Sequence, residues 1–189
     1  MFGPYHVLGA LGSRFAVHFL GPSRDPVASS IGAAVIPDGT WERDEPFDVL
    51  MVPGGQGTRT AVNDARLIDG IRRHSGGAEL VASVCTGAAL LATAGLLDGR
   101  RATSNKLAWE WVTSCGPLTE WVPQARWVTD GNVITSGGVA AGIDMSLALV
   151  ARCHGEELAR RLADGIEYEW HADPDRDPFA AKAGLVEPR

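Results

Sequence analysis

The sequence is poor in cysteine, and it lacks the residue spacings that disulfide frameworks and metal sites use. Its three cysteines, Cys85, Cys115 and Cys153, are an odd number without a CxxC pair, which argues against a disulfide framework and a thiolate zinc site. The five histidines include no pair spaced four residues apart, as a helical metal site would have. We therefore expect free thiols and no bound metal.

An excess of positive charge and a long apolar run are also missing. With 17 Lys and Arg against 23 Asp and Glu, the formal net charge is −6, so the chain lacks the basic surface that neutralises phosphates. No apolar stretch approaches the roughly 20 residues of a membrane span, and Met1–Ala10 lacks the features of a signal peptide. Neither nucleic acid nor a membrane is expected as a partner, and the cytoplasm is the expected compartment.

The length and composition of the chain fit a single domain. Its 189 residues, 45% of them hydrophobic, are enough to bury a sizeable core. We assign this domain to residues 1–170. Residues 171–189 are rich in Asp, Pro and Ala, which predicts a polar C-terminal tail that is docked or partly disordered.

Segments with the periods of strands and helices alternate along the domain. Strands are expected at Arg14–Leu20, Asp48–Pro53, Glu79–Val84 and Arg101–Ser104. Helices are expected at Gly57–His74, Gly87–Ala94, Asn105–Thr113, Val139–Cys153 and Gly155–Trp170. A hairpin near a sheet edge is expected at Arg126–Thr129 and Asn132–Ser136, because Asp130-Gly131 suits a type I′ turn. This order predicts an α/β three-layer sandwich, a mostly parallel sheet with helices on both faces.

Two of the predicted strands end in loops of unusual composition. Pro53–Gly57 follows one of these strands, and Cys85–Gly87 follows the next. Sites in parallel sheets form beyond the carboxyl ends of the strands. We therefore expect the two loops to be neighbours in space.

Cys85 lies at the junction between a predicted strand and a predicted helix. There its sulfur is close to the free N–H groups of the helix start, which favour the thiolate, the form that attacks electrophiles. Gly87 permits close backbone approach, and the N–H groups of Thr86 and of Gly54 and Gly55 are candidates for an oxyanion hole. The alternative is that Cys85 is a small buried apolar residue, as free cysteines commonly are. Spacing alone leaves both interpretations open.

Four motifs together resemble a known family. They are ASVCTGAALLATAGLLDGRRAT at Ala82–Thr103, VPGG at Val52–Gly55, GNVITSGGVAAGID at Gly131–Asp144 and GP at Gly3-Pro4. In these segments the chain resembles the ThiJ/PfpI superfamily, a branch of the class I glutamine amidotransferase-like fold. The resemblance implies a flavodoxin-like sandwich and a homodimer, with Cys85 as the nucleophile on a sharp elbow and Gly55 and Thr86 near the oxyanion site.

Within the superfamily the sequence is most similar to the isonitrile hydratase-type branch, whose members add water to R–N≡C and yield an N-substituted formamide. The resemblance implies a cofactor-free lyase in which a Cys85 thiolate attacks the carbon of a small-molecule isonitrile. The alternatives are a glyoxalase-like or deglycase-like enzyme and a non-enzymatic redox or ligand sensor of the same superfamily. No helix-turn-helix pattern follows Trp170, which argues against the form found in AraC-type regulators.

The sequence departs from the family pattern at two places. Where family members with a catalytic histidine carry it, this chain has Asn105, whose simpler role is to cap the following helix. Its alternative role is to line the pocket together with Gly137 and Gly138. In the isonitrile hydratase-type branch the catalytic acid is the Asp of Asp-x-x-Gly-Pro, and here that position immediately precedes Met1. The family also has a buried strand upstream, so we expect the native polypeptide to begin about 15 to 20 residues earlier, one strand plus a loop.

Overall fold

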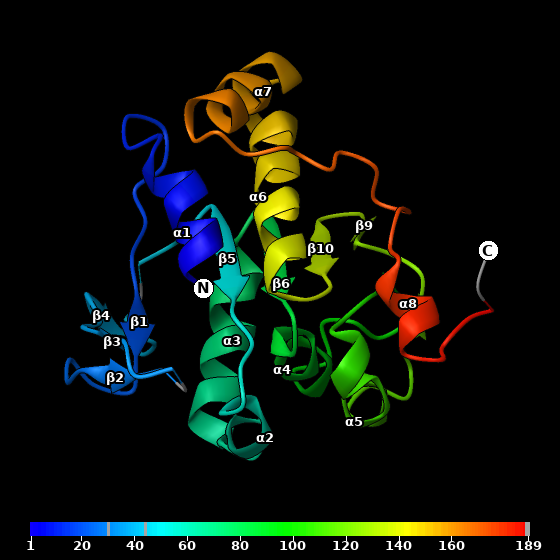
Figure 1. Ribbon diagram of the computed structural model, residues 1–189. Coiled ribbons are helices and arrows are strands. Elements are labelled where there is room, and N and C mark those ends of the chain that lie inside the picture. The colour runs from blue at the N-terminus through cyan, green and yellow to red at the C-terminus, as the bar shows by residue number, and fades with distance from the viewer. Residues whose placement is uncertain (30, 44, 188–189) are drawn as a thin grey trace.

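The computed structural model describes residues 1–29, 31–43 and 45–187 (Figure 1). The strands are β1 (Leu20–Gly21), β2 (Val27–Ala28), β3 (Ala34–Val35), β4 (Gly39–Thr40), β5 (Val49–Val52), β6 (Leu80–Val84), β7 (Arg101–Ala102), β8 (Glu120–Trp121), β9 (Trp127–Asp130) and β10 (Val133–Ser136). The helices are α1 (Phe2–Gly9), α2 (Thr58–Ala61), α3 (Ala65–Gly77), α4 (Gly87–Thr93), the 3₁₀ helix η1 (Lys106–Ala108), α5 (Trp109–Ser114), α6 (Val139–His154), α7 (Glu156–Gly165) and α8 (Phe179–Lys182).

The central sheet has four strands in the order β5-β6-β10-β9. Strands β5, β6 and β10 are parallel, while β9 runs antiparallel to β10. The turn between β9 and β10 includes Gly131 at φ +58°, a left-handed conformation that glycine adopts without strain. Both the α/β fold with a mostly parallel sheet and the edge hairpin are confirmed.

Alternating residues along the strands of the sheet pack into two separate hydrophobic cores, one on each face of the sheet. Val81 and Val133 pack with α3, α4 and α5, whereas Ala82 and Ile134 pack with α1, α6 and α7. This alternation is the two-residue period of a strand that is buried on both sides. Helices therefore cover both faces, which makes the molecule a three-layer sandwich (Figure 1).

Two predicted helices differ from the observed ones because of local capping. The single helix expected over Gly57–His74 is divided into α2 and α3, since Asp64 caps α3 by accepting hydrogen bonds from Arg66 N and Leu67 N at 3.0 and 3.2 Å. The helix expected over Gly155–Trp170 ends at Gly165, and Glu167 has a positive φ of 51° just beyond it.

The strand expected at Arg14–Leu20 is wrong except for Leu20, which belongs to β1. An alternating pattern is not sufficient for a strand without a neighbouring strand to receive its hydrogen bonds. Strand β1 pairs only with β4, in a two-stranded ladder apart from the central sheet (Figure 1). Helix α1, which the sequence analysis did not anticipate, precedes this segment and packs on α6.

Strand β5 stands at the edge of the central sheet although it is apolar on both faces. Leu50 packs on one core, and Val49 and Met51 pack on the other. A cavity of about 370 Å³ separates β5 from the extended segment 15–20, and residues of both segments line it. Among the described residues no backbone hydrogen bond joins the two segments. The cavity is therefore bordered on two sides by extended backbone. A further strand between two neighbouring strands would be bordered in the same way.

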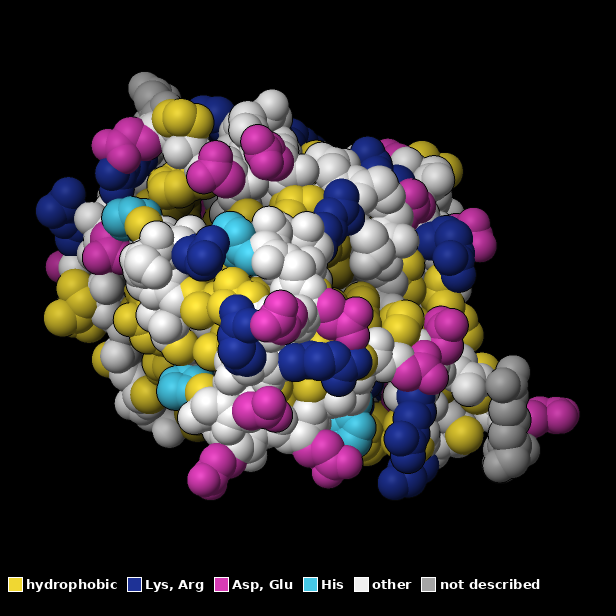
Figure 2. Space-filling model, turned by 90° about the horizontal axis from the view of Figure 1, so that it is seen from above, with side chains coloured by type: hydrophobic (Ala, Val, Ile, Leu, Met, Phe, Trp, Pro, Cys, Tyr) yellow, Lys and Arg dark blue, Asp and Glu magenta, His cyan; other side chains and the backbone are white. Residues whose placement is uncertain are grey.

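The C-terminal tail is docked over residues 171–187, whereas residues 188 and 189 of the predicted tail lie outside the described residues. It runs from α7 past β10 and β9 to α8 (Figure 1). On the face that carries α7, acidic and basic side chains are mixed (Figure 2), and Arg160 pairs with Glu156 there. None of the helices in the described part of the chain combines the length and apolar character that crossing a membrane requires.

Candidate functional site

Cys85 occupies a sharp elbow between β6 and α4. Its φ is +58°, a left-handed conformation that residues other than glycine rarely adopt, so the surrounding structure must hold it in place. Its N–H donates to the carbonyl oxygens of Ser136 and Gly137 at 3.1 and 2.8 Å. Its own carbonyl accepts a hydrogen bond from Ser104 Oγ at 2.8 Å. The loops after β7 and β10 therefore fix the cysteine that follows β6.

The two loops that the sequence analysis expected to be neighbours are in direct contact. A Cβ on Gly87 would lie 2.2 Å from the carbonyl oxygen of Val52, and a Cβ on Gly54 would lie 2.6 Å from Thr86 N. Real side chains do not tolerate such distances to backbone atoms, so glycine is required at both positions. A side chain at position 54 would collide with the N–H of Thr86.

Gly55 and Thr86 bond to each other in this structure. Gly55, at φ +138°, donates its N–H to Thr86 Oγ1 at 2.9 Å, and Thr86 Oγ1 lies 3.2 Å from the Gly55 carbonyl oxygen. The N–H of Gly55 is therefore engaged rather than directed at a ligand. In the described chain, the N–H of Thr86 has no hydrogen-bond acceptor. Thr86 N is thus the better placed of the two donors for an anion that develops near Cys85.

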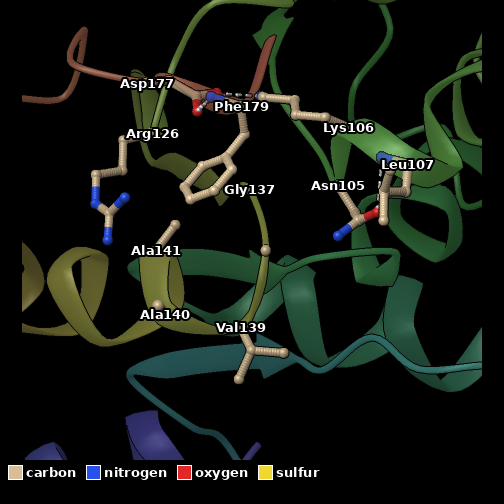
Figure 3. Close-up of a pocket in the computed structure, with 11 residues that line it drawn as sticks. Asn105, Lys106, Leu107, Arg126, Gly137, Val139, Ala140, Ala141, Asp177 and Phe179 are labelled. Carbon is tan, nitrogen blue, oxygen red and sulfur yellow. Dashed lines mark hydrogen bonds and ion pairs between the residues drawn. The ribbon is translucent and has the colours of Figure 1, made fainter. Parts of the chain in front are cut away.

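Asn105, Gly137 and Gly138 lie together on the wall of a second cavity, of about 210 Å³ (Figure 3). Asn105 Oδ1 accepts hydrogen bonds from the N–H groups of Leu107 and Ala108, which is the capping role. Its Nδ2 lies 3.5 Å from where a Cβ on Gly138 would stand. One amide therefore caps the helix and also faces the cavity.

The start of α1 lies close to Cys85. Burial lowers the pKa of the Met1 amino group, and the charge of Cys85 acts in the opposite direction. Met1 also lines the 370 Å³ cavity beside β5. The amino group of Met1 is therefore close enough to Cys85 for their charges to interact.

The other two cysteines lack this setting. Partial loss of hydration raises the pKa of the half-buried Cys115 thiol and of the Cys153 thiol, which is otherwise exposed, and this disfavours both thiolates. Cys115 Sγ contacts the carbonyl oxygen of Trp111 at 3.4 Å within α5 and its C-cap. No group of three or more metal-ligating side chains is found among the described residues. Cys85 is the thiol whose position fits nucleophilic chemistry.

Lys106 is a residue of this region that the sequence analysis missed. Its side chain is only 5% exposed, and it pairs with Asp177 of the tail at 3.2 Å (Figure 3). Burial lowers the pKa of Lys106, while the charge of Asp177 opposes that effect. A lone lysine at the start of a helix is ordinarily solvated, so no local pattern marks it as buried.

Comparison with known proteins identifies the family and the fold. The family model described as the DJ-1/PfpI family matches residues 1–152. The chain belongs to the DJ-1/PfpI family. A ThiJ/PfpI family protein from Pseudomonas syringae has a crystal structure with a TM-score of 0.81 and 34% identity, covering 99% of this chain and 74% of that one.

Two relatives that are similar in sequence have names that describe different functions. Isonitrile hydratase of Pseudomonas putida is 37% identical over 166 residues, which are 88% of this chain and 71% of that protein. The HTH-type transcriptional regulator CdhR of Pseudomonas aeruginosa is 36% identical over 147 residues, 78% of this chain but only 43% of the regulator. Enzymes and regulators thus share this domain.

Proposed function

We propose that this protein is a cofactor-free, cysteine-dependent hydratase that converts a small isonitrile into an N-substituted formamide. The observation that carries the proposal is the elbow, where Cys85 is held in a left-handed conformation next to Thr86, whose N–H has no hydrogen-bond acceptor in the described part of the chain. The similarity to the isonitrile hydratase of Pseudomonas putida supports the choice of substrate class.

The first half of the proposed reaction forms a covalent intermediate. The Cys85 thiolate attacks the terminal carbon of R–N≡C and forms a C–S bond. A proton is added to the same carbon, which gives the thioimidate R–N=CH–S–Cys85. Proton delivery to the carbon avoids a carbanion, so a general acid is needed here.

The second half releases the product and restores the thiolate. Water adds to the thioimidate carbon, and the nitrogen takes up a proton. The C–S bond then breaks and the water-derived oxygen loses its remaining proton, so that R–NH–CHO leaves and Cys85 is again a thiolate. The N–H of Thr86 is the proposed donor to the oxygen on which negative charge develops.

The acid is proposed to be the residue immediately before Met1, on a strand that enters the slot between β5 and segment 15–20. The Met1 amino group interacts with the charge of Cys85, so this residue would stand beside the reacting carbon. A strand parallel to β5 would end at the same end of the sheet as β5, the carboxyl end of the strands, where α1 begins. It would supply the backbone partners that the facing edges of β5 and segment 15–20 lack.

The test compares three forms of the protein with a simple alkyl isonitrile as the substrate. They are the 189-residue chain, the chain extended by the in-frame codons upstream, and the extended chain with Cys85→Ala. We expect formamide, measured by mass spectrometry, only from the extended chain with Cys85 present. The matched control is Cys153→Ala in the extended chain, which removes an exposed thiol and should retain turnover.

Each outcome separates the two parts of the proposal. Turnover that survives Cys85→Ala would refute the nucleophile. Equal turnover by the short and extended chains, or a stop codon directly before Met1, would refute the upstream acid and strand. A well-folded extended protein without turnover would instead favour the glyoxalase-like or deglycase-like alternative, or the sensor.

A ligand sensor is the second candidate, because the domain is also shared with the regulator CdhR. A sensor would bind small molecules without turning them over, and a redox sensor would oxidise Cys85 selectively. Product formation distinguishes these functions from the hydratase.

A homodimer in the cytoplasm is the proposed assembly and compartment, as the family resemblance implies. The three free cysteines fit a reducing compartment. Light scattering at several protein concentrations tests the dimer, and a mass of one chain at every concentration would refute it.

A further inference from the structure

The C-terminal tail forms one wall of the 210 Å³ cavity, because Asp177 and Phe179 line it together with residues of the central domain (Figure 3). Three contacts fasten the tail to the domain: His171 N to Asp144 Oδ1 at 3.0 Å, Arg126 N to the Pro174 carbonyl at 2.6 Å, and Lys106 Nζ to Asp177 Oδ2 at 3.2 Å. The contacts follow one another along the chain. The tail is therefore a fixed wall of the cavity rather than a loose end.

The last of these contacts is a buried ion pair that places Phe179. The side chains of Lys106 and Asp177 are 5% and 4% exposed. The ammonium also donates to Thr103 Oγ1, at 2.7 Å, and lies within 3.2 Å of two backbone carbonyls. The second oxygen of Asp177 accepts the N–H of Phe179 at 2.8 Å. One carboxylate thus joins the tail to the domain and begins the turn that carries the aromatic ring.

Two loops in the rest of the cavity wall also hold Cys85, which is not itself one of the lining residues. Gly137 accepts the Cys85 N–H, and the loop through Ser104 and Asn105 donates to the Cys85 carbonyl. The ring of Phe179 lies over Gly137 and Ala141 in the close-up (Figure 3). Phe179 is 51% exposed, so part of its surface faces solvent and part closes the cavity.

We infer that Phe179 determines which substrates the site accepts, by limiting the size of the group R on the isonitrile nitrogen, and that the Lys106–Asp177 pair is its positioning device. The inference rests on the proposed function, because it assigns the cavity to the substituent R of the isonitrile. The lining is mainly apolar and backbone, which suits an uncharged alkyl or aryl group.

The kinetic test compares methyl isonitrile with cyclohexyl isonitrile in the form of the protein that shows turnover. Phe179→Ala is expected to raise the ratio of kcat/KM for the bulky over the small substrate by about tenfold, the size of discrimination that one apolar wall gives. Phe179→Trp is expected to lower the same ratio. Leu118→Ala is the matched control, since it removes an apolar side chain that is 67% exposed and is not part of the cavity lining.

The Lys106–Asp177 pair is tested by the same ratio of kcat/KM for the bulky over the small substrate. Asp177→Asn should raise this ratio, as Phe179→Ala does, whereas a purely structural role of the pair would lower kcat/KM for both substrates alike. A ratio that stays within about twofold of wild type in both Phe179 variants overturns the inference.

A readout without turnover keeps this inference separate from the proposed function. Iodoacetamide and a bulky N-aryl iodoacetamide are reacted with the 189-residue chain, and alkylation of the Cys85 peptide is followed by mass spectrometry. Phe179→Ala should accelerate the bulky reagent selectively. If no isonitrile is hydrated but this selectivity appears, the proposed hydratase activity is refuted and the role of Phe179 in limiting access to Cys85 is supported. If the ratio of the alkylation rates of the bulky and small reagents is the same in wild type and in Phe179→Ala, the proposed role of Phe179 is refuted.

Discussion

At the scale of single residues, the site depends on backbone approach that only glycine allows. Gly87 brings the first turn of α4 against the end of β5, where its missing Cβ would overlap the Val52 carbonyl oxygen. This close approach of α4 to β5 determines the position of Cys85 relative to the sheet. The cysteine itself adopts a left-handed conformation, so its position reflects several neighbours acting together.

Gly87→Ala is expected to destabilise the protein by about 1–3 kcal/mol, because a backbone carbonyl cannot move aside as a flexible side chain can. Gly76→Ala is the matched control, since a Cβ there meets nothing within 4 Å inside α3. Alanine is the better helix former, so the control should be neutral or stabilising by up to about 1 kcal/mol. Urea unfolding of the two variants measures this difference. Equal losses in both would contradict the close-approach argument.

At the scale of elements, two kinds of ion pair contribute very differently. Helix α7 carries exposed pairs on its solvent face, such as Arg160 with Glu156 at 2.6 Å. The tail is held by a pair that is almost completely buried. Removing one partner of a buried pair leaves an uncompensated charge in a medium of low dielectric, while exposed charges are solvated either way.

Asp177→Asn is therefore expected to cost about 3–5 kcal/mol of unfolding free energy. The matched control Glu156→Gln should change it by no more than about 1 kcal/mol. Chemical denaturation gives both values. Combining Asp177→Asn with Lys106→Met should recover much of the loss, since no buried charge is then left unpaired. A double variant less stable than Asp177→Asn alone would show that the pair acts in another way.

At the scale of the whole molecule, stability at high pH depends on Tyr168, which lies between α7 and the tail in the sequence. Burial raises the pKa of Tyr168, and the negative charge of Asp144 raises it further. In the unfolded chain a tyrosine ionises at about pH 10. Since the folded protein binds this proton more tightly, the stability it contributes is present below about pH 10 and is lost as the pH rises toward the raised pKa.

Tyr168→Phe should remove the part of the loss of stability at high pH that is due to ionisation of Tyr168. Between about pH 9 and pH 11, the unfolding free energy of wild type is expected to fall more steeply than that of the variant. Tyr5→Phe is the matched control, because Tyr5 is exposed and is the only other tyrosine of the sequence. Urea titrations at the two pH values test the prediction. Parallel slopes for wild type and Tyr168→Phe would refute it.

The sequence by itself determined the parts of this protein that depend on local pattern. Short apolar runs predict the parallel strands β5 and β6, because strands buried on both faces have no polar period. Asp130-Gly131 predicts the hairpin, since the turn requires positive φ. The resemblance carried by the motif around Cys85 implies the elbow, and the rule that sites form at the carboxyl ends of parallel strands predicts that Pro53–Gly57 lies beside it.

The tertiary structure alone decided what depends on contacts between distant segments. The alternating segment 15–20 does not become a strand, because strand formation needs a partner edge that this pattern cannot supply. Lys106 is buried only because Asp177, 71 positions later, meets its charge. The hydroxyl of Thr86 engages the N–H of Gly55, which changes which donor is free beside Cys85. Hydrogen bonds and ion pairs across such separations leave no periodic trace in the sequence, so only the folded chain reveals them.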